Sequence, residues 1–369
     1  MAHRRPPRAP APGRGARPGG LTLAALLALA APATAESLRV ATWGADLSRD
    51  GPGLLLRDIL KGDDPGIEGV AAVLAEARPD VLLLTDLDWD ADGIALSALA
   101  ERLAREGLGY PYRLALPTNA GAATGLDLDG NGRTGEARDA QGFGRFAGDG
   151  GMALLSRWPL GEARDLSTLL WRDLPGSRQP GAFPSEEAAA ARRLSSDGHW
   201  IVPVEAPGGA VTLLAWDATT PVFDGPEDLN GLRNADELAL WRRVLDGAFG
   251  PAPRDFVLLG NADLDPADGE GLRADMAALL ADPRVQDPRP LSEGGRLAAS
   301  PGQAGDPALD TADWPEEDGP GNLRVDYVLP AATLRVTGAG VVWPAPGDPL
   351  ASAAEAAGPH RLVWVDLDR

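Results

Sequence analysis

The chain has 369 residues and no cysteine, which excludes disulfides, thiolate metal sites and cysteine redox chemistry. Acidic side chains outnumber basic ones by 54 to 34, and Lys61 is the one lysine in the chain. A net charge of −20 repels phosphate backbones, whose binding depends on Lys and Arg, so we expect no binding to long nucleic acids.

The N-terminal segment 1–35 has the layout of a secretory signal peptide. Five arginines and no acid precede the apolar run 21–32, and the small residues ATA end at Ala35. The run is shorter than the ~20 apolar residues that a membrane-spanning helix needs. We therefore expect cleavage after Ala35 and an exported chain, periplasmic or extracellular, without a membrane segment. Arg4 and Arg5 leave the twin-arginine route open beside the general secretory route. Cleavage leaves 29 basic against 54 acidic side chains, a net charge of −25.

Strand and helix patterns alternate along the remainder, 36–369, which is expected to form one domain. Strands are predicted at 38–47, 80–90, 151–160, 199–206, 210–218, 256–262, 323–330, 334–343 and 360–367. Helices are predicted at 66–79, 94–108, 233–247 and 271–281. This alternation indicates an α/β fold. Two Pro/Gly-rich stretches, 172–198 and 284–322, are predicted to be long loops.

The stretch 127–132 has the spacing of the first half of a calcium-binding loop. Asp127, Asp129 and Asn131 stand at alternate positions, and the glycine that follows permits a sharp turn. The twelfth position, where such loops carry a bidentate glutamate, is Arg138. The same residues also fit a polar hairpin, because Asp-Gly and Asn-Gly favour tight turns. The sequence leaves both alternatives open.

Polar side chains recur where the predicted strands end. In FVLLGNADLDP, Asn261 ends a buried strand and Asp263 follows two residues later. Alternate residues of a strand point the same way, so both side chains should face one pocket. Asp86 and Asp217 likewise end buried strands, in LLLTDLD and LLAWD.

Seven motifs, in chain order, resemble those of the endonuclease/exonuclease/phosphatase superfamily: ATWG, LLLTDLD, GMALLSRWP, LLAWD, VLLGNADLDP, LRVDYVL and PHRLVWVDL. The resemblance covers nearly the whole mature chain. It implies a four-layer α/β/β/α sandwich with two central mixed sheets and an active site where loops leave the sheets. It also implies phosphoester hydrolysis with a divalent metal, usually magnesium.

The resemblance transfers the family's active residues unevenly. Asp86 matches the metal-binding acid after the second strand, and Asp326 and His360 match the family's Asp-His pair. An aspartate at that place can orient the imidazole and favour its charged form. Three positions depart from the family, whose asparagine, histidine and aspartate are replaced by Gly44, Asp217 and Pro359.

The family's Gly-Asp-x-Asn is reversed here, because Asn261 comes first and Asp263 second. An amide at the first position has no basic oxygen for the proton of the attacking water, and a carboxylate at the second repels the charge developing on phosphate. Two residues along a strand span about 6–7 Å. Since a displacement of about 1 Å can already cost roughly 10²-fold in rate, the reversal predicts weak or lost catalysis.

Two functions remain open from the sequence. One is a metal-dependent phosphoesterase with weak or lost activity on a small or soluble phosphorylated substrate. In it, magnesium is held by Asp86 with added carboxylates, and the catalytic candidates are His360, Asp326, Asn261, Asp263 and Asp217. The other is a non-catalytic binding or structural protein, a pseudoenzyme on the same scaffold. His199, in SSDGHW, is predicted either to line the pocket and bind substrate or to pack at a strand edge.

Overall fold

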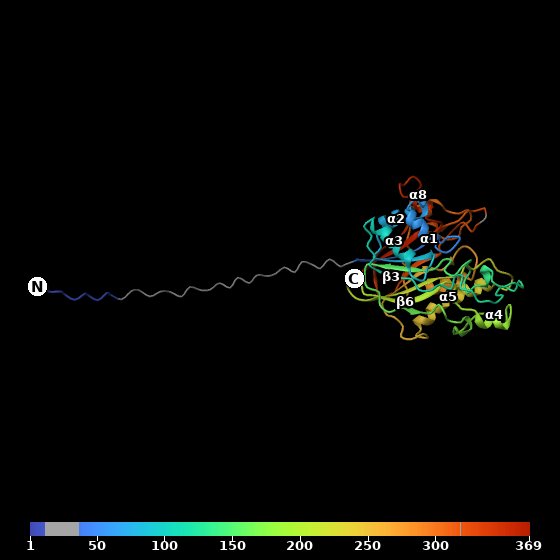
Figure 1. Ribbon diagram of the computed structural model, residues 1–369, viewed down its shortest axis with the longest axis horizontal. Coiled ribbons are helices and arrows are strands. Elements are labelled where there is room, and N and C mark those ends of the chain that lie inside the picture. Colours follow the sequence, from blue (N-terminus) through green and yellow to red (C-terminus); the bar gives the residue numbers. More distant parts are fainter. Residues whose placement is uncertain (12–36, 318) are drawn as a thin grey trace. The chain divides into compact units, whose positions relative to one another are not determined.

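Two mixed sheets form the centre of the fold in this computed structural model, which describes residues 1–11, 37–317 and 319–369 (Figure 1). In spatial order, the six-stranded sheet consists of β12 (Arg335–Val342), β13 (Leu362–Asp368), β1 (Ser37–Leu47), β2 (Val81–Leu87), β4 (Ala153–Ser156) and β3 (Tyr112–Leu114). The five-stranded sheet consists of β11 (Asp326–Pro330), β8 (Phe256–Asn261), β7 (Val211–Asp217), β6 (Gly198–Val204) and β5 (Arg164–Asp165). The pairs β1–β2 and β7–β8 are parallel, and the other neighbours within these sheets are antiparallel.

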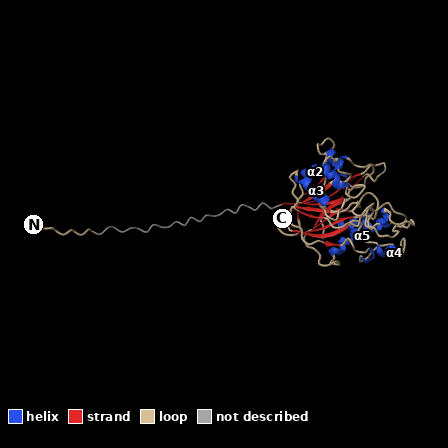
Figure 2. Ribbon diagram, in the orientation of Figure 1, coloured by secondary structure: helices blue, strands red, loops and turns tan. Residues whose placement is uncertain are grey.

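Helices lie on both sides of the strands (Figure 2). One apolar cluster joins the six-stranded sheet to α1 (Leu54–Lys61), α2 (Pro65–Ala77), α3 (Ile94–Ala104) and α8 (Ala351–Ala356). A second cluster includes residues of both sheets together with α5 (Leu229–Leu245) and α6 (Arg273–Leu280). This mixed α/β arrangement with two large mixed sheets confirms the predicted fold class.

The packing of β1 follows from the alternation of side chains along a strand. Leu38 and Val40 belong to the cluster that joins the two sheets, whereas Ala41 and Trp43 belong to the cluster with the helices. Both faces of the six-stranded sheet are therefore covered, which explains why its strands read as continuous apolar runs.

Most predicted elements are present with shorter bounds, and several short ones were not expected. The sequence analysis did not predict α1, α8, β3 or β5. The two stretches predicted to be long loops contain short elements instead of irregular chain alone. The first begins within a 3₁₀ turn (Trp171–Asp173) and holds α4 (Glu186–Ala191). The second holds α7 (Glu293–Leu297), a 3₁₀ turn (Pro307–Leu309), β9 (Ala312–Asp313) and β10 (Asn322–Leu323).

Residues Glu36–Arg369 form one compact unit. The apolar run 21–32 of the predicted signal and its cleavage point after Ala35 lie outside the described residues. Within the described ranges, every helix is too short or too polar to cross a bilayer.

The core between the sheets provides a test of the fold. Leu83 of β2 is fully buried in the cluster that joins the sheets. Leu83→Ala should lower the free energy of unfolding by about 2–5 kcal/mol, because it removes transfer energy and leaves a cavity. Leu60→Ala is the matched control, since Leu60 is exposed, and should change it by less than about 0.5 kcal/mol. Urea denaturation measures both; equal effects would contradict this packing.

Candidate active site

Three polar side chains stand in a row at the ends of adjacent strands. Asn261 of β8 is paired in register with Asp217 of β7 on one side and with Asp326 of β11 on the other. Side chains of directly paired residues lie on the same face of a sheet. Exposed fractions of 8%, 8% and 0% for Asp217, Asn261 and Asp326 show that the row is nearly buried.

The six-stranded sheet contributes the facing wall. Gly44 of β1 and Thr85 of β2 are register partners, and both line the same pocket as Asp217 and Asn261. Asp86 lines it too, although neighbours in a regular strand face opposite sides. Its φ of 56°, a left-handed conformation that aspartate adopts more readily than most residues, accounts for this change of direction. Such backbone strain concentrates at functional sites.

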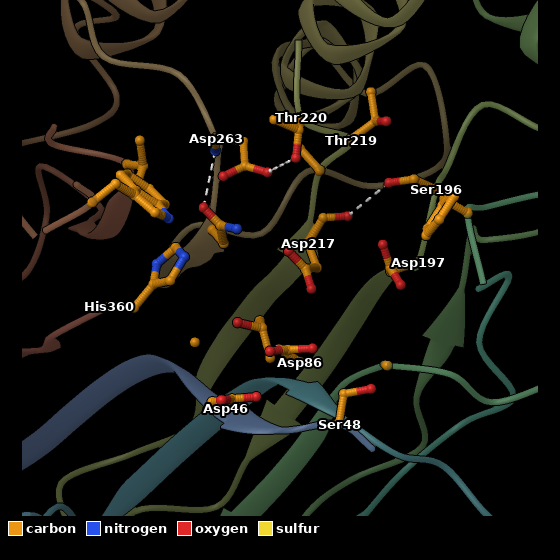
Figure 3. Close-up of a pocket in the computed structure, with 18 of the residues that line it drawn as sticks. Asp46, Ser48, Asp86, Ser196, Asp197, Asp217, Thr219, Thr220, Asp263 and His360 are labelled. Atoms are coloured by element: carbon orange, nitrogen blue, oxygen red, sulfur yellow. Dashed lines mark hydrogen bonds between the residues drawn. The ribbon is translucent and has the colours of Figure 1, made fainter. Parts of the chain in front are cut away.

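The pocket has a volume of about 1340 Å³ and a strongly acidic lining. Figure 3 shows Asp86, Asp197, Asp217, Asp263 and His360 around one space. The lining acids are Asp46, Asp50, Asp64, Asp86, Asp149, Asp197, Asp217, Asp263, Asp265, Asp268 and Glu270. The lining also carries two arginines, but both are paired with acids: Arg49 with Asp58 and Asp64, and Arg145 with Asp50 and Asp149.

His360 forms an ion pair with Asp326. The Nδ1 atom of His360 lies 2.8 Å from Oδ2 of Asp326, so Nδ1 donates and Nε2 remains for another partner. Burial alone would lower the pKa of His360, but the charges of Asp326, Asp263 and Asp86 and the hydrogen bond to Asp326 raise it to about 9. The imidazole is therefore cationic at neutral pH. The ring of Trp314 meets it edge-on at a centroid distance of 5.1 Å.

The imidazole also explains the glycine at position 44. A Cβ atom on Gly44 would lie 3.0 Å from Cγ and 3.2 Å from Nδ1 of His360. An asparagine at this position would require the ring to shift. Gly44 thus permits the close approach between β1 and His360.

Burial raises the pKa of four pocket carboxylates: Asp86, Asp197, Asp217 and Asp263. Asp86 opens onto the cavity but is enclosed by its walls, and this burial, reinforced by Asp46, raises its pKa to about 8. Burial also raises the pKa of Asp197 to about 6. The pKa of Asp217 lies well above its usual value because of burial and the charges of Asp197 and Asp263. The pocket is therefore short of positive charge.

The donor set fits a hard divalent cation. Thr85 lines the pocket and Asp326 is paired with the lining residue His360; the Thr85 hydroxyl and Oδ1 of Asp326 are both buried, and neither has a hydrogen-bond partner among the described residues. Carboxylate oxygens suit Mg²⁺ and Ca²⁺. Within the described ranges, no three acidic or histidine side chains of the pocket come within 4.8 Å of one another. That spacing suits Mg²⁺, which keeps several waters and takes one or two carboxylates.

His199 lies outside the pocket, so the prediction that it lines the pocket and binds substrate is wrong. The side chain is fully buried; its ring lies 2.8 Å from the Ser195 hydroxyl and 3.3 Å from the Glu237 carbonyl oxygen. His199 pairs in register with Trp216, and both rings contact Trp241 of α5. Burial lowers its pKa to about 3, so the ring is neutral. The packing alternative describes this residue.

A buried polar network on α5 holds the pocket loops, and the sequence analysis missed it. The Glu237 carboxylate accepts hydrogen bonds from the N–H and hydroxyl of Ser196 at 2.6 and 2.9 Å and from the Thr219 N–H at 2.8 Å. Asn234 donates to the carbonyl oxygens of Thr219 and Ala262 at 2.8 and 2.7 Å. These bonds hold the chain next to Asp197, Asp217 and Asp263, at Ser196, Thr219 and Ala262.

A sequence signal for this network exists. Residues 233, 234 and 237 share a helix face with the core residue Trp241, at spacings of one, four and eight from position 233. Polar residues on the core-facing side of a helix need partners. The helix was predicted to begin at 233, whereas α5 begins at Leu229. Asp197, which also lines the pocket, was likewise not predicted.

The loop predicted to bind calcium brings together three carboxylates away from the pocket. Oxygens of Asp127, Asp129 and Asp139 lie within 4.8 Å of one another. Asp139 is 2% exposed, and its carboxylate accepts hydrogen bonds from the N–H groups of Leu128 and Glu136 at 2.9 and 3.0 Å. Asp139, which supplies the third carboxylate, thus follows directly after Arg138, the residue at the twelfth position of the loop. The Asn131 amide nitrogen donates to Asp129 at 3.0 Å.

Comparisons with known proteins agree with this architecture. A family model described as "Endonuclease/Exonuclease/phosphatase family" matches residues 58–358. A search of curated proteins finds no match. An endonuclease/exonuclease/phosphatase from Beutenbergia cavernae is 22% identical with a TM-score of 0.55, covering 90% of this chain and 71% of that one. An endonuclease/exonuclease/phosphatase family protein from Leptotrichia buccalis is 14% identical with a TM-score of 0.50, covering 90% and 100%. At these identities the two structures support the fold alone.

The raised pKa values predict that the metal-free protein loses stability as the pH rises from about 4 to about 9. Asp86 keeps its proton to about pH 8 in the folded state, whereas the unfolded chain loses it near pH 4, so the folded state binds more protons in that interval. His360 makes the stability of the folded state change with pH in the same direction. Its charged imidazole stabilises the folded state fully below about pH 6.5, and this stabilisation is lost as the pH rises through about 9.

Urea unfolding in a chelator, measured from pH 4 to pH 9, tests this prediction. Asp217→Asn should reduce the loss, because it removes a buried carboxylate with a raised pKa. Asp63→Asn is the matched control, since Asp63 is a surface acid. Stability that stays flat or increases over this interval in the wild type would contradict the assignment.

Proposed function

We propose that this chain, which belongs to the endonuclease/exonuclease/phosphatase family, is an exported protein that binds a divalent cation and hydrolyses small phosphoesters weakly or not at all. The proposal rests on which side chain stands between Asp217 and Asp326 in the row. The family has a carboxylate at this place, and here it is the amide of Asn261. Export rests on the signal layout of residues 1–35.

The phosphoester class is supported by the charges that face the pocket. A bound magnesium ion would neutralise phosphate charge and act as a Lewis acid. Asp86 would hold it, and Asp217 and Asp263 would complete the polar site. His360, whose Nδ1 is bonded to Asp326, has its Nε2–H free to donate to a phosphate oxygen, and its positive charge favours the anion.

The weakness of catalysis is supported by the hydrogen bonds of the reversed loop. Oδ1 of Asn261 accepts from the N–H of Asp263 at 2.9 Å, and an amide oxygen is not basic enough to take a proton from water. The Asp263 carboxylate accepts from the Thr220 hydroxyl at 2.7 Å and adds negative charge to the pocket. The attacking water therefore lacks a base at position 261, and the phosphate meets a carboxylate instead of an amide at 263.

The acidic lining supports a small substrate. A single phosphoester brings one or two charges, which one cation and His360 can balance. A long nucleic acid brings a charge for every phosphate, and the mature chain has a net charge of −25. We therefore propose a small or soluble phosphorylated substrate.

A non-catalytic binding protein on the same scaffold is the second candidate. The contact of His360 with Gly44 favours it, because the ring occupies space beside the position where the family has an asparagine. In this case the pocket would bind a cation and a phosphorylated ligand without turnover. Equilibrium binding together with absent turnover would distinguish the two candidates.

Restoring the family order tests the proposed loss of activity. Asn261→Asp with Asp263→Asn should increase the turnover of 4-nitrophenyl phosphoesters in magnesium, because general-base catalysis is typically worth ~10²–10⁴-fold. The new aspartate would stand between Asp217 and Asp326, and their repulsion would raise its pKa. Adding Asp217→His should therefore give a triple variant that is faster than the double variant.

The control for this series is His360→Ala in the triple variant, which should abolish the gain. Each variant is compared at equal folded concentration by steady-state kinetics with magnesium, manganese and calcium. A wild type that already turns over rapidly, with slower double and triple variants, would show that the reversed order is an active arrangement. The proposed weakness would then be wrong.

We also propose that the loop 127–139 binds calcium, supported by the position of Asp139 beside Asp127 and Asp129. Calcium bound to the folded state alone should raise the melting temperature by mass action, worth about 2.7 kcal/mol at a hundredfold excess over Kd. The increase should persist in Asp217→Asn, which alters the pocket, and disappear in Asp129→Ala. Equal increases in wild type and Asp129→Ala, or none in either, would contradict a calcium site in this loop.

A further inference from the structure

Two phenylalanine rings line the pocket although most of their area is exposed. The exposed fractions are 68% for Phe143 and 78% for Phe223, so both rings lie at the mouth of the pocket. They come from separate segments, one before β4 and one between β7 and α5. A single exposed apolar side chain needs no explanation. Two exposed rings on the lining of one pocket do, because exposed apolar area near a cavity marks binding surfaces.

The backbone around Phe143 is packed on both sides. A Cβ atom on Gly142 would overlap the carbonyl oxygen of Ser196, and one on Gly144 would overlap the backbone nitrogen of Gly121. Gly142 also donates to the carbonyl of Asn119 at 2.9 Å. Both flanks of Phe143 therefore lie directly against neighbouring backbone, and the ring projects from a fixed base.

Phe223 is held in a strained conformation. Its φ of 70° is in the left-handed region, where a bulky aromatic residue is an outlier that the surrounding structure must enforce. Asn230, in the first turn of α5, provides that constraint on both sides. Its side-chain nitrogen donates to the carbonyl of Val222 at 2.7 Å, and its backbone N–H donates to the carboxylate of Asp224.

We propose that Phe143 and Phe223 form an aromatic mouth that binds a flat aromatic group of the phosphorylated ligand. This assignment rests on the proposed function, because the phosphate end of the ligand would lie toward His360 and the bound cation. Aromatic faces stack on flat rings largely without regard to sequence or substituent. The pocket lining also includes other apolar residues: Pro221, Val222, Trp314, Pro315 and Pro320.

A flat ring fits this mouth better than a lipid surface. The mature chain carries a net charge of −25, and the pocket lining is acidic, so an anionic membrane would repel this face. Membrane binding by apolar side chains also relies on a larger amphipathic surface, whereas the mouth consists of two rings on rigid flanks.

Two non-hydrolysable probes separate recognition of the ring from catalysis. Phenylphosphonate and methylphosphonate share the phosphonate group and differ in the ring, and neither has a phosphoester bond to hydrolyse. Calorimetric titration of the mature protein in magnesium should show that phenylphosphonate binds about tenfold more tightly or better, the range expected for stacking on an aromatic side chain.

Substitutions of Phe143 and Phe223 test whether their two rings cause this preference for phenylphosphonate. Phe143→Ala with Phe223→Ala should remove the preference and leave the affinity for methylphosphonate unchanged. Replacing both by leucine keeps apolar bulk without a ring and should remove most of it. Tyr112→Ala is the matched control, because Tyr112 is an exposed aromatic residue on β3, and it should leave both affinities unchanged. Melting curves establish that each variant is folded.

Each other outcome is decisive. Equal affinity of the wild type for the two probes would overturn the aromatic mouth and leave the proposed function standing. Failure of both probes to bind would contradict the proposed function and the mouth with it. If the double alanine variant lost methylphosphonate binding as strongly as phenylphosphonate binding, the two rings would support the structure of the pocket instead of binding the ring of the ligand. Binding of phosphatidylcholine vesicles that depends on the rings, without a preference between probes, would assign the mouth to lipid and overturn the inference.

Discussion

The register of β7, β8 and β11 fixes Asp217, Asn261 and Asp326 as direct neighbours. Backbone hydrogen bonds set this row, so a substitution in it changes the chemistry of a position without moving it. An aspartate at 261 would place three buried carboxylates side by side. The amide of Asn261 avoids that repulsion. The resemblance to the family implies a histidine at position 217 and a carboxylate at position 261, and on that reading the two substitutions would be electrostatically coupled, because each changes the charge that its neighbour meets.

The hydrogen-bond network of α5 keeps the carboxylates of the pocket close together, so the excess of negative charge in the pocket persists. Glu237 and Asn234 hold the chain beside Asp197, Asp217 and Asp263 through buried and partly buried hydrogen bonds, so a movement of these loops that separated the carboxylates would break those bonds. Repulsion that cannot relax by movement must be relieved by protons or by a cation. The rigid surroundings therefore account both for the raised pKa values and for the fit to a divalent cation.

Much of the site was predictable because its residues end strands. The apolar runs placed Asp86, Asp217 and Asn261 at strand ends, whereas Asp326, the first residue of β11, was found only through the resemblance to the family. The face occupied by His199 was not predictable, because β6 is buried on both faces and shows no alternation of polar and apolar residues. Short helices such as α1 and α8 depend on packing rather than on their own sequences. The position of Asp139 depends on a local 3₁₀ turn, which motif spacing does not record.

The aromatic mouth and the catalytic row are independent parts of the pocket. Phe143 is fixed by backbone packing around Gly142 and Gly144, and Phe223 by Asn230, whereas the row is fixed by strand register. Substitution of the row therefore leaves the mouth intact. Under the proposed function, a chain without a general base at position 261 would still select a ligand by its ring and its phosphate. The two candidate functions would then differ only in the row and would share the mouth.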